Sequence, residues 1–196
     1  MKRIVCLIAL VVALGAFPAV GKADTLVFIG TLTGAQEVPP VASPGIGFAV
    51  VTFDTVAHTL TVSVTFSGLV SPTAVSHIHC CAPPGTNAGV ATPVPTFPGF
   101  PAGVQDGSYT NTFDLTNISS FNPAFITAQG GTVFGAEAAL LAGLLNGTAY
   151  FNIHTVMFPG GEIRGQLHLV PEPGTLLLFG TGIAGAIGLI RRRRKT

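Results

Sequence analysis

The chain has 196 residues, of which 48% are hydrophobic and 9% are charged, and its formal net charge is +1. The charges are segregated, because residues 24–170 hold seven acidic residues and one basic residue, whereas the last six residues hold five basic ones. A segment with a single cation cannot neutralise a phosphate backbone, so nucleic-acid binding is excluded, and the length predicts one domain.

Residues 1–23 have the pattern of a secretory signal peptide. Two basic residues precede the apolar run 4–17, which is too short to be a stable membrane anchor. Small residues at Gly21 and Ala23 predict cleavage by signal peptidase after Ala23, with cleavage after Gly21 as the alternative. The rest of the chain is therefore expected to be exported.

Residues 24–170 are predicted to form a mostly β domain. Seven runs have the alternation or the β-branched composition of strands: 25–33, 47–54, 59–67, 74–79, 108–116, 149–155 and 162–169. The run 59–67 is the clearest, because Thr and Ser alternate there with large apolar residues. Strands with polar outer faces predict an antiparallel β-sandwich or a partly closed barrel.

Two segments of the domain depart from the strand pattern. Residues 82–107 contain six Pro and five Gly, which predicts a long irregular loop and a candidate functional surface. Residues 134–145 are rich in Ala and Leu, which predicts one short crossover helix with Glu137 in its first turn. The stripe expected to face the core of the domain consists of Phe134, Ala138, Leu141 and Leu145.

Five sequence blocks of the domain occur together: 32–40 (LTGAQEVPP), 67–69 (SGL), 77–79 (HIH), 150–155 (YFNIHT) and 161–167 (GEIRGQL). In this order they resemble the CHRD domain, which is named for its repeats in chordin and also occurs alone in exported bacterial proteins. The resemblance implies an extracellular β domain without an established activity. The pair Cys80-Cys81 departs from the commoner His-x-His-Gly of that family.

Three histidines are candidate metal ligands. His77 and His79 are two residues apart on a predicted strand, so both rings lie outside the sheet, side by side, if Ile78 is in the core. His154 follows the same alternation in the last hairpin. Three imidazoles on fixed strands suit Cu or Zn. The alternative is that the rings donate hydrogen bonds to loop backbone and pin the segment 82–107.

The cysteines Cys80 and Cys81 are the only ones that remain once residues 1–23 are removed, and the exported chain enters an oxidising compartment. Three interpretations are open. The two residues form a vicinal disulfide, or they are thiols that join His77 and His79 at a metal, or one of them forms an intermolecular bridge.

Arg164 is the only basic residue of 24–170 and lies on a predicted strand. Its planar guanidinium suits a carboxylate, and we expect a structural ion pair with Glu37. The alternative is that Arg164 binds an anionic ligand.

The C-terminal segment 171–196 has three parts, which are Pro171-Glu172-Pro173, an apolar helix at 174–190 and a basic tail at 191–195. The helix is just long enough to cross a bilayer with local thinning, and the tail favours a cytoplasmic end. The arrangement resembles the PEP-CTERM sorting signal of Gram-negative bacteria. That resemblance implies cleavage near Pro-Glu-Pro by an exosortase, a membrane protease, and release to the cell surface, usually in bacteria that make exopolysaccharide. The alternative is a plain tail anchor.

Two classes of function remain. The favoured one is an exported, non-catalytic surface or matrix module with a binding or structural role, for which exopolysaccharide and surface proteins are candidate partners. The other is a Cu- or Zn-binding metalloprotein, redox-active in one version, that uses His77, His79 and His154. The sequence contains no readable Ser-His-Asp arrangement or phosphate loop, so no catalytic residue is predicted and no organic cofactor is expected.

Overall fold

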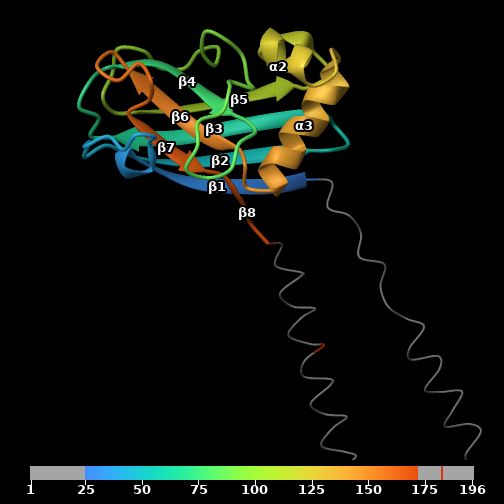
Figure 1. Ribbon diagram of the computed structural model, residues 1–196, viewed down its shortest axis with the longest axis horizontal. Helices are drawn as coiled ribbons and strands as arrows, with labels where there is room; N and C mark the ends of the chain where they lie inside the picture. The colour runs from blue at the N-terminus through green and yellow to red at the C-terminus, as the bar shows by residue number, and fades with distance from the viewer. Residues whose placement is uncertain (1–24, 172–181, 183–196) are drawn as a thin grey trace, which may run out of the picture.

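The computed structural model shown in Figure 1 describes residues 25–171 and Gly182. Four predicted features therefore lie outside the described residues: the signal peptide 1–23, Glu172 and Pro173 of the sorting motif, the membrane helix 174–190 except Gly182, and the basic tail 191–195. Among the residues described, none of the helices has the length and apolar character that a membrane crossing requires.

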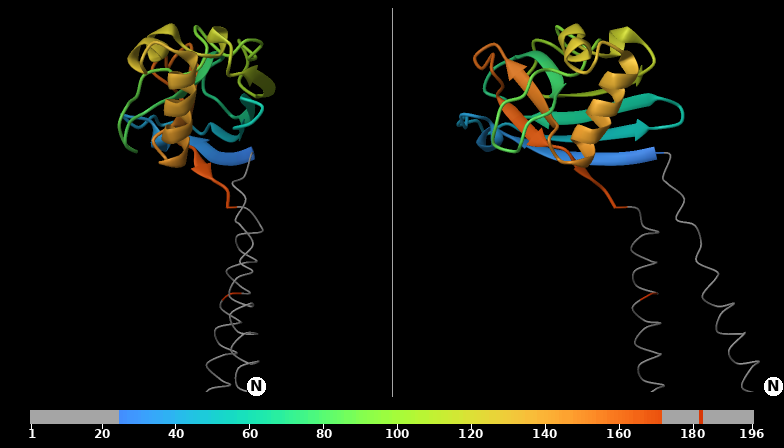
Figure 2. Two further views of the ribbon diagram at one scale, coloured as in Figure 1. Left: turned by 90° about the vertical axis from the view of Figure 1, so that its right-hand side faces the viewer. Right: turned by 45° about the vertical axis from the view of Figure 1, so that its right-hand side comes forward.

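The strands form one eight-stranded antiparallel sheet in the order β4-β6-β7-β1-β2-β3-β5, with β8 also paired to β1. Their bounds are β1 Thr25–Thr33, β2 Ile46–Asp54, β3 Thr59–Ser67, β4 Thr73–His79, β5 Gly107–Asp114, β6 Tyr150–Thr155, β7 Ile163–Gln166 and β8 His168–Leu169. The sheet curls into a half-barrel (Figures 1 and 2). The prediction of a mostly β, partly closed barrel is confirmed, whereas the described residues contain no second sheet that would make a sandwich.

The alternation of each strand explains which face of the sheet is buried. On β3 the apolar residues point into the core: Leu60, Val62, Val64 and Phe66. The hydroxyl residues between them lie on the outer face, where Thr61 bonds Thr112 at 2.8 Å and Ser63 bonds Thr110 at 3.0 Å on the neighbouring β5. Such cross-strand hydroxyl pairs support the register of the two strands.

The first and last strands of the domain are paired. Phe28 and Ile29 of β1 are opposite Leu169 and His168 of β8, and the Val170 N–H donates to the carbonyl of Val27 at 2.8 Å. The predicted single strand 162–169 is interrupted at Leu167, whose N–H instead donates to the Ala149 carbonyl. This pairing thus joins the first and last strands of the domain in the middle of the sheet.

Within residues 25–171, two α-helices are present where one was expected. The first, α2 (Pro123–Ala128), begins with Asn122, whose side chain accepts from the Ala124 N–H, and with proline at its first position. It is too short to show helical periodicity in the sequence. Short 3₁₀ helices occur at Gly34–Gln36 and Ile118–Ser120.

The second helix, α3 (Val133–Leu145), lies where the sequence predicts it and crosses one end of the curled sheet (Figure 2). Its predicted buried stripe is wrong, because Phe134 and Leu145 are 62% and 48% exposed. The residues that are buried instead are Ala136, Glu137, Leu140, Gly143 and Leu144. The helix has its own apolar residues on every side, so hydrophobicity alone does not select the buried face. Small side chains, which allow close approach, determine that face instead. Glu137 lies beyond the first turn and pairs with His58 at 2.8 Å.

The loop 82–107 supplies part of the core and is not only a surface. Phe97 is fully buried, and its ring lies 5.4 Å from Phe113, 5.8 Å from Phe151 and 5.9 Å from Tyr109, measured between ring centroids. Offset aromatic pairs at these distances are stabilising. The loop therefore fills the open side of the half-barrel from within.

Candidate functional site

The three candidate histidines lie together in the structure. His77 and His79 come from β4 and His154 comes from the adjacent strand β6, and one ring nitrogen of each lies within 4.8 Å of the others. The closest pair is His79 Nε2 and His154 Nε2, at 3.4 Å. The side chains are 5%, 7% and 7% exposed, respectively, so the cluster is closed to bulk solvent.

The strand register explains this cluster. Ile78 is opposite Phe151, and both residues are fully buried in the core. The next positions of both strands therefore face the other side of the sheet, where His77 is opposite Asn152 and His79 is opposite Tyr150. The rings lie side by side as predicted, but they are covered by loops rather than open to solvent.

In each ring, one nitrogen forms a hydrogen bond with a loop carbonyl. The bonds run from His77 Nε2 to Pro95 at 2.7 Å, from His79 Nδ1 to Ala88 at 2.9 Å and from His154 Nδ1 to Pro159 at 3.0 Å. A carbonyl only accepts, so these nitrogens carry the hydrogen in the neutral rings. The His77 and His79 rings thus pin the loop 82–107, and the His154 ring pins the turn that contains Pro159. The second nitrogen of each neutral ring carries a lone pair and no hydrogen.

The histidines are neutral at pH 7. Burial lowers the pKa of His77 and of His79 from 6.5 to about 4, and it also lowers the pKa of His154. The carbonyls of Pro95 and Ala88 oppose this shift only in part. Neutral imidazole is the form that binds a metal ion.

These pKa shifts predict that the metal-free domain loses stability in acid. Between pH 6.5 and 4 the histidines of the unfolded chain bind protons that the buried rings do not, so the free energy of unfolding falls as pH falls. Burial raises the pKa of Glu37 to about 7. Between pH 4.5 and 7 this shift makes the free energy of unfolding rise as pH falls, but it concerns one group only. Urea unfolding midpoints at pH 7 and pH 4, measured with a chelator present, check this result.

A control variant for this pH dependence is His79→Gln, which should decline less steeply toward acid because one titrating ring is absent. A midpoint that stays constant from pH 7 to pH 4 in the wild-type domain would show that the rings are protonated as easily in the folded as in the unfolded chain.

Arg164 does not form the expected ion pair with Glu37, since within the described part of the chain no nitrogen–oxygen contact of 4.0 Å or less joins them. The guanidinium donates from Nε to the Gln36 carbonyl and from Nη1 to Asn87 Oδ1 at 2.8 Å, and it lies 4.5 Å from the centre of the Tyr150 ring. Its donors are thus used by loop groups. It still lowers the pKa of Glu37 through space, against the larger effect of burial.

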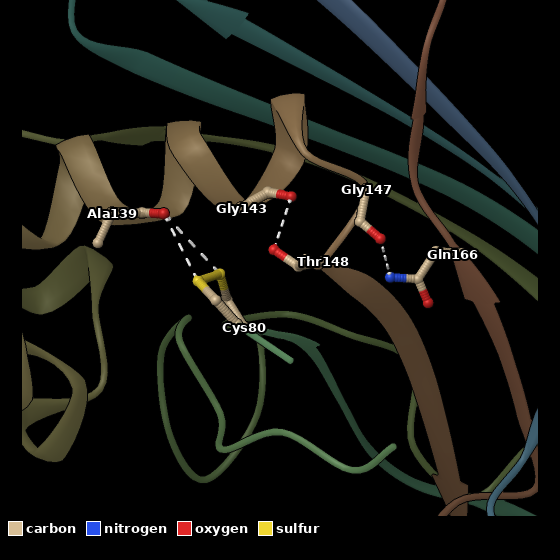
Figure 3. The surroundings of a disulfide bond; sticks show 7 residues. Cys80, Ala139, Gly143, Gly147, Thr148 and Gln166 are labelled. Carbon is tan, nitrogen blue, oxygen red and sulfur yellow. Dashed lines mark hydrogen bonds between the residues drawn. A yellow bond between two sulfur atoms is a disulfide. The ribbon is translucent and has the colours of Figure 1, made fainter. Parts of the chain in front are cut away.

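Cys80 and Cys81 form a vicinal disulfide with each other. Figure 3 shows this disulfide against α3, where the Ala139 carbonyl oxygen lies 3.5 Å from Cys81 Sγ. A side chain at Gly143 would collide with both sulfur atoms. The interpretation as thiols that join the histidines at a metal is wrong, because the two sulfur atoms are bonded to each other and lie against Gly143 of α3.

Sequence reasoning missed Tyr150 and Asn152, which lie opposite His79 and His77 on the same face of the sheet. We call the buried polar residues of this face the polar layer. The His79 ring stacks on the Tyr150 ring with the centroids 4.9 Å apart. Both residues alternate with Phe151 and Ile153 on β6 in the same way as His154, and this periodicity could have identified them.

The fold and the site define a β domain with a vicinal disulfide and a buried histidine cluster on one antiparallel half-barrel sheet. The family model of the CHRD domain matches residues 28–167, so the chain belongs to the CHRD domain family. The model of the PEP-CTERM protein-sorting motif matches residues 169–195. Comparisons with curated proteins and with solved structures found no significant match.

These two matches confirm both resemblances seen in the sequence. A CHRD domain joined to a PEP-CTERM motif marks an exported β module of the cell surface. The motif implies processing by exosortase, a membrane protease.

Proposed function

We propose that the CHRD domain of this protein is a non-catalytic surface module that binds one copper or zinc ion at His77, His79 and His154. The observation that carries the proposal is the 3.4 Å separation of His79 Nε2 and His154 Nε2. In both rings the hydrogen is on Nδ1, which donates it to a backbone carbonyl on the far side of the ring. Neither Nε2 can therefore donate to the other. Two facing lone pairs repel unless a cation lies between them.

The His79–His154 pair fits a tetrahedral ion. Two nitrogens 3.4 Å apart subtend about 110° at an ion that lies ~2.0–2.1 Å from each. The ligand nitrogens of all three rings lie within 4.8 Å of one another, and on binding the His77 ring would close any remaining gap to the ~2.0–2.1 Å ligand distance. Its facing nitrogen, Nδ1, is buried and has no hydrogen-bond partner.

The surroundings of the rings also fit a metal site. Metal-binding histidines usually donate their second N–H to a carbonyl or carboxylate, which fixes the tautomer, and all three rings here do so. An all-imidazole donor set suits copper and zinc. Because the cluster is closed by the loops 82–107 and 156–162, we infer a role in holding these loops to the sheet rather than turnover of a large substrate.

The test is the metal content of the exported domain, purified without chelators and loaded with Zn²⁺ or Cu²⁺. About one ion per chain is expected, and it should be lost in His79→Ala. The matched control is His168→Ala, which removes an exposed histidine on β8 and should retain the ion. A wild-type domain that is folded and takes up neither metal would overturn the proposal.

The export route completes the proposed function. Signal peptidase removes residues 1–23, the helix 174–190 holds the chain briefly in the inner membrane, and exosortase releases it near Pro171-Glu172-Pro173. The domain then acts at the cell surface, where exopolysaccharide or other surface proteins are the candidate partners. The match to the sorting motif over residues 169–195 supports this route.

A further inference from the structure

Three buried side-chain atoms have no hydrogen-bond partner among the residues that the structure describes, and all three lie in one polar layer. They are Glu37 Oε1, His77 Nδ1 and Asn152 Oδ1. Buried polar atoms without partners cost free energy and are rare in native proteins, so three of them in one place call for an explanation.

Asn152 lies at the centre of this layer. On the sheet it is opposite His77 on one side and Arg164 on the other, and it is two residues from His154 on the same face. Its side chain is 2% exposed. Residues directly opposite on antiparallel strands have Cβ atoms ~4.5–5.5 Å apart, so the Asn152 amide borders the histidine cluster.

Glu37 extends the layer beyond Asn152. Oxygen atoms of both residues adjoin Gly161, where a Cβ would lie 2.6 Å from Glu37 Oε1 and 2.7 Å from Asn152 Oδ1. The two oxygens are therefore close enough for one water molecule to bridge them. An amide oxygen can only accept, and no described residue forms a hydrogen bond to Asn152 Oδ1. When Glu37 is ionised, as its carboxylate would be beside a cation, it cannot supply the missing donor either.

We propose that a metal-bound water fills the fourth coordination position of the histidine site and donates to Asn152 Oδ1 and Glu37 Oε1. This proposal rests on the proposed metal site. The ion would satisfy His77 Nδ1, and its water would satisfy the two oxygens, so one bound group accounts for all three unpartnered atoms. Three histidines with one solvent ligand form an open site, and the covering loops restrict its exchangeable ligands to small oxygen donors and anions.

The first test measures Zn²⁺ affinity by competition with a chromophoric chelator. Asn152→Leu removes the acceptor for the water, and residues that orient a metal site in this way typically change affinity by ~10–100-fold, so a loss of that size is expected. Asn152→Asp retains an acceptor and should bind at least as tightly as wild type. The matched control, Asn111→Leu on the distant strand β5, should not alter affinity, and unfolding midpoints of the metal-free variants verify that each one folds.

The second test uses the Co²⁺-loaded wild-type domain and azide as a small anionic ligand. Azide should displace the water and shift the visible absorption of the cobalt. No azide response together with unchanged Zn²⁺ affinity in Asn152→Leu would overturn the water ligand while the metal site stands. Weakened Zn²⁺ binding without an azide response would also overturn it, in favour of direct ligation by Asn152. A wild-type domain that binds neither Zn²⁺ nor Co²⁺ would instead reject the metal site itself.

Discussion

Replacing Phe97 with alanine is expected to lower the free energy of unfolding by ~3–5 kcal/mol. Phe97 lies in the loop 82–107 but is fully buried, and its ring packs on three other aromatic rings. Truncation would leave a cavity that rigid strands on two sides cannot close. Urea unfolding followed by circular dichroism measures the loss.

The matched control for Phe97 is Phe134→Ala on α3, where the ring is 62% exposed. Its effect should stay within ~0.5 kcal/mol, as is usual for surface substitutions. Equal losses in the two variants would show that the loop packs on the domain only from outside, and that Phe97 is not part of the core.

Glu162→Ala is expected to destabilise the domain by ~3–5 kcal/mol. The Glu162 carboxylate is fully buried and accepts from the Val70 N–H at 2.6 Å, from Ser43 Oγ at 2.7 Å and from Thr155 Oγ1 at 2.8 Å. It thus connects two loops to β6. Alanine leaves three buried donors without an acceptor, and hydrogen bonds to charged groups contribute ~1.5–3 kcal/mol each.

Thermal or urea unfolding of two companion variants tests this account of Glu162. Glu162→Gln should lose less stability, because its remaining oxygen can keep two of the three bonds. Asp106→Ala should change little, since Asp106 is exposed and accepts a single bond from the Gly68 N–H. A loss as large in Asp106→Ala as in Glu162→Ala would contradict the role of the buried carboxylate.

The strands could be predicted because each one carries a local signal. Period-2 alternation of Thr and Ser with large apolar residues located β3 at its observed bounds, and a run of β-forming apolar residues located β1 at its observed bounds. The buried face of α3 could not be predicted, since Ala and Leu surround the helix and the disulfide that packs on Gly143 lies far away in the sequence. Phe97 likewise has no periodic neighbours in a Pro- and Gly-rich loop, and its partners come from distant strands.

The histidine cluster was predictable for the same reason as the strands. His77, His79 and His154 alternate with core residues, so their face follows once Ile78 is placed inside. The partners of Arg164 were not predictable, because they are a backbone carbonyl and an amide in two irregular loops. The expected ion pair assumed that Arg164, the only basic residue of 24–170, contacts a carboxylate directly. In the structure Glu37 is buried near Arg164, but no ion pair joins the two residues.

The pairing of β1 with β8 also determines when the protein can fold. Phe28 finds its partner Leu169 only near the end of the domain, and β4 must wait for β6, so these sheet contacts join residues far apart in the chain. Long-range pairing of this kind is slow, because the ends of a long chain segment must meet first. If the chain is exported N-terminus first, as proposed above, the sheet cannot be completed until Val170 has crossed. On this proposed route the sorting segment follows directly, so it would reach the membrane before or while the fold is completed.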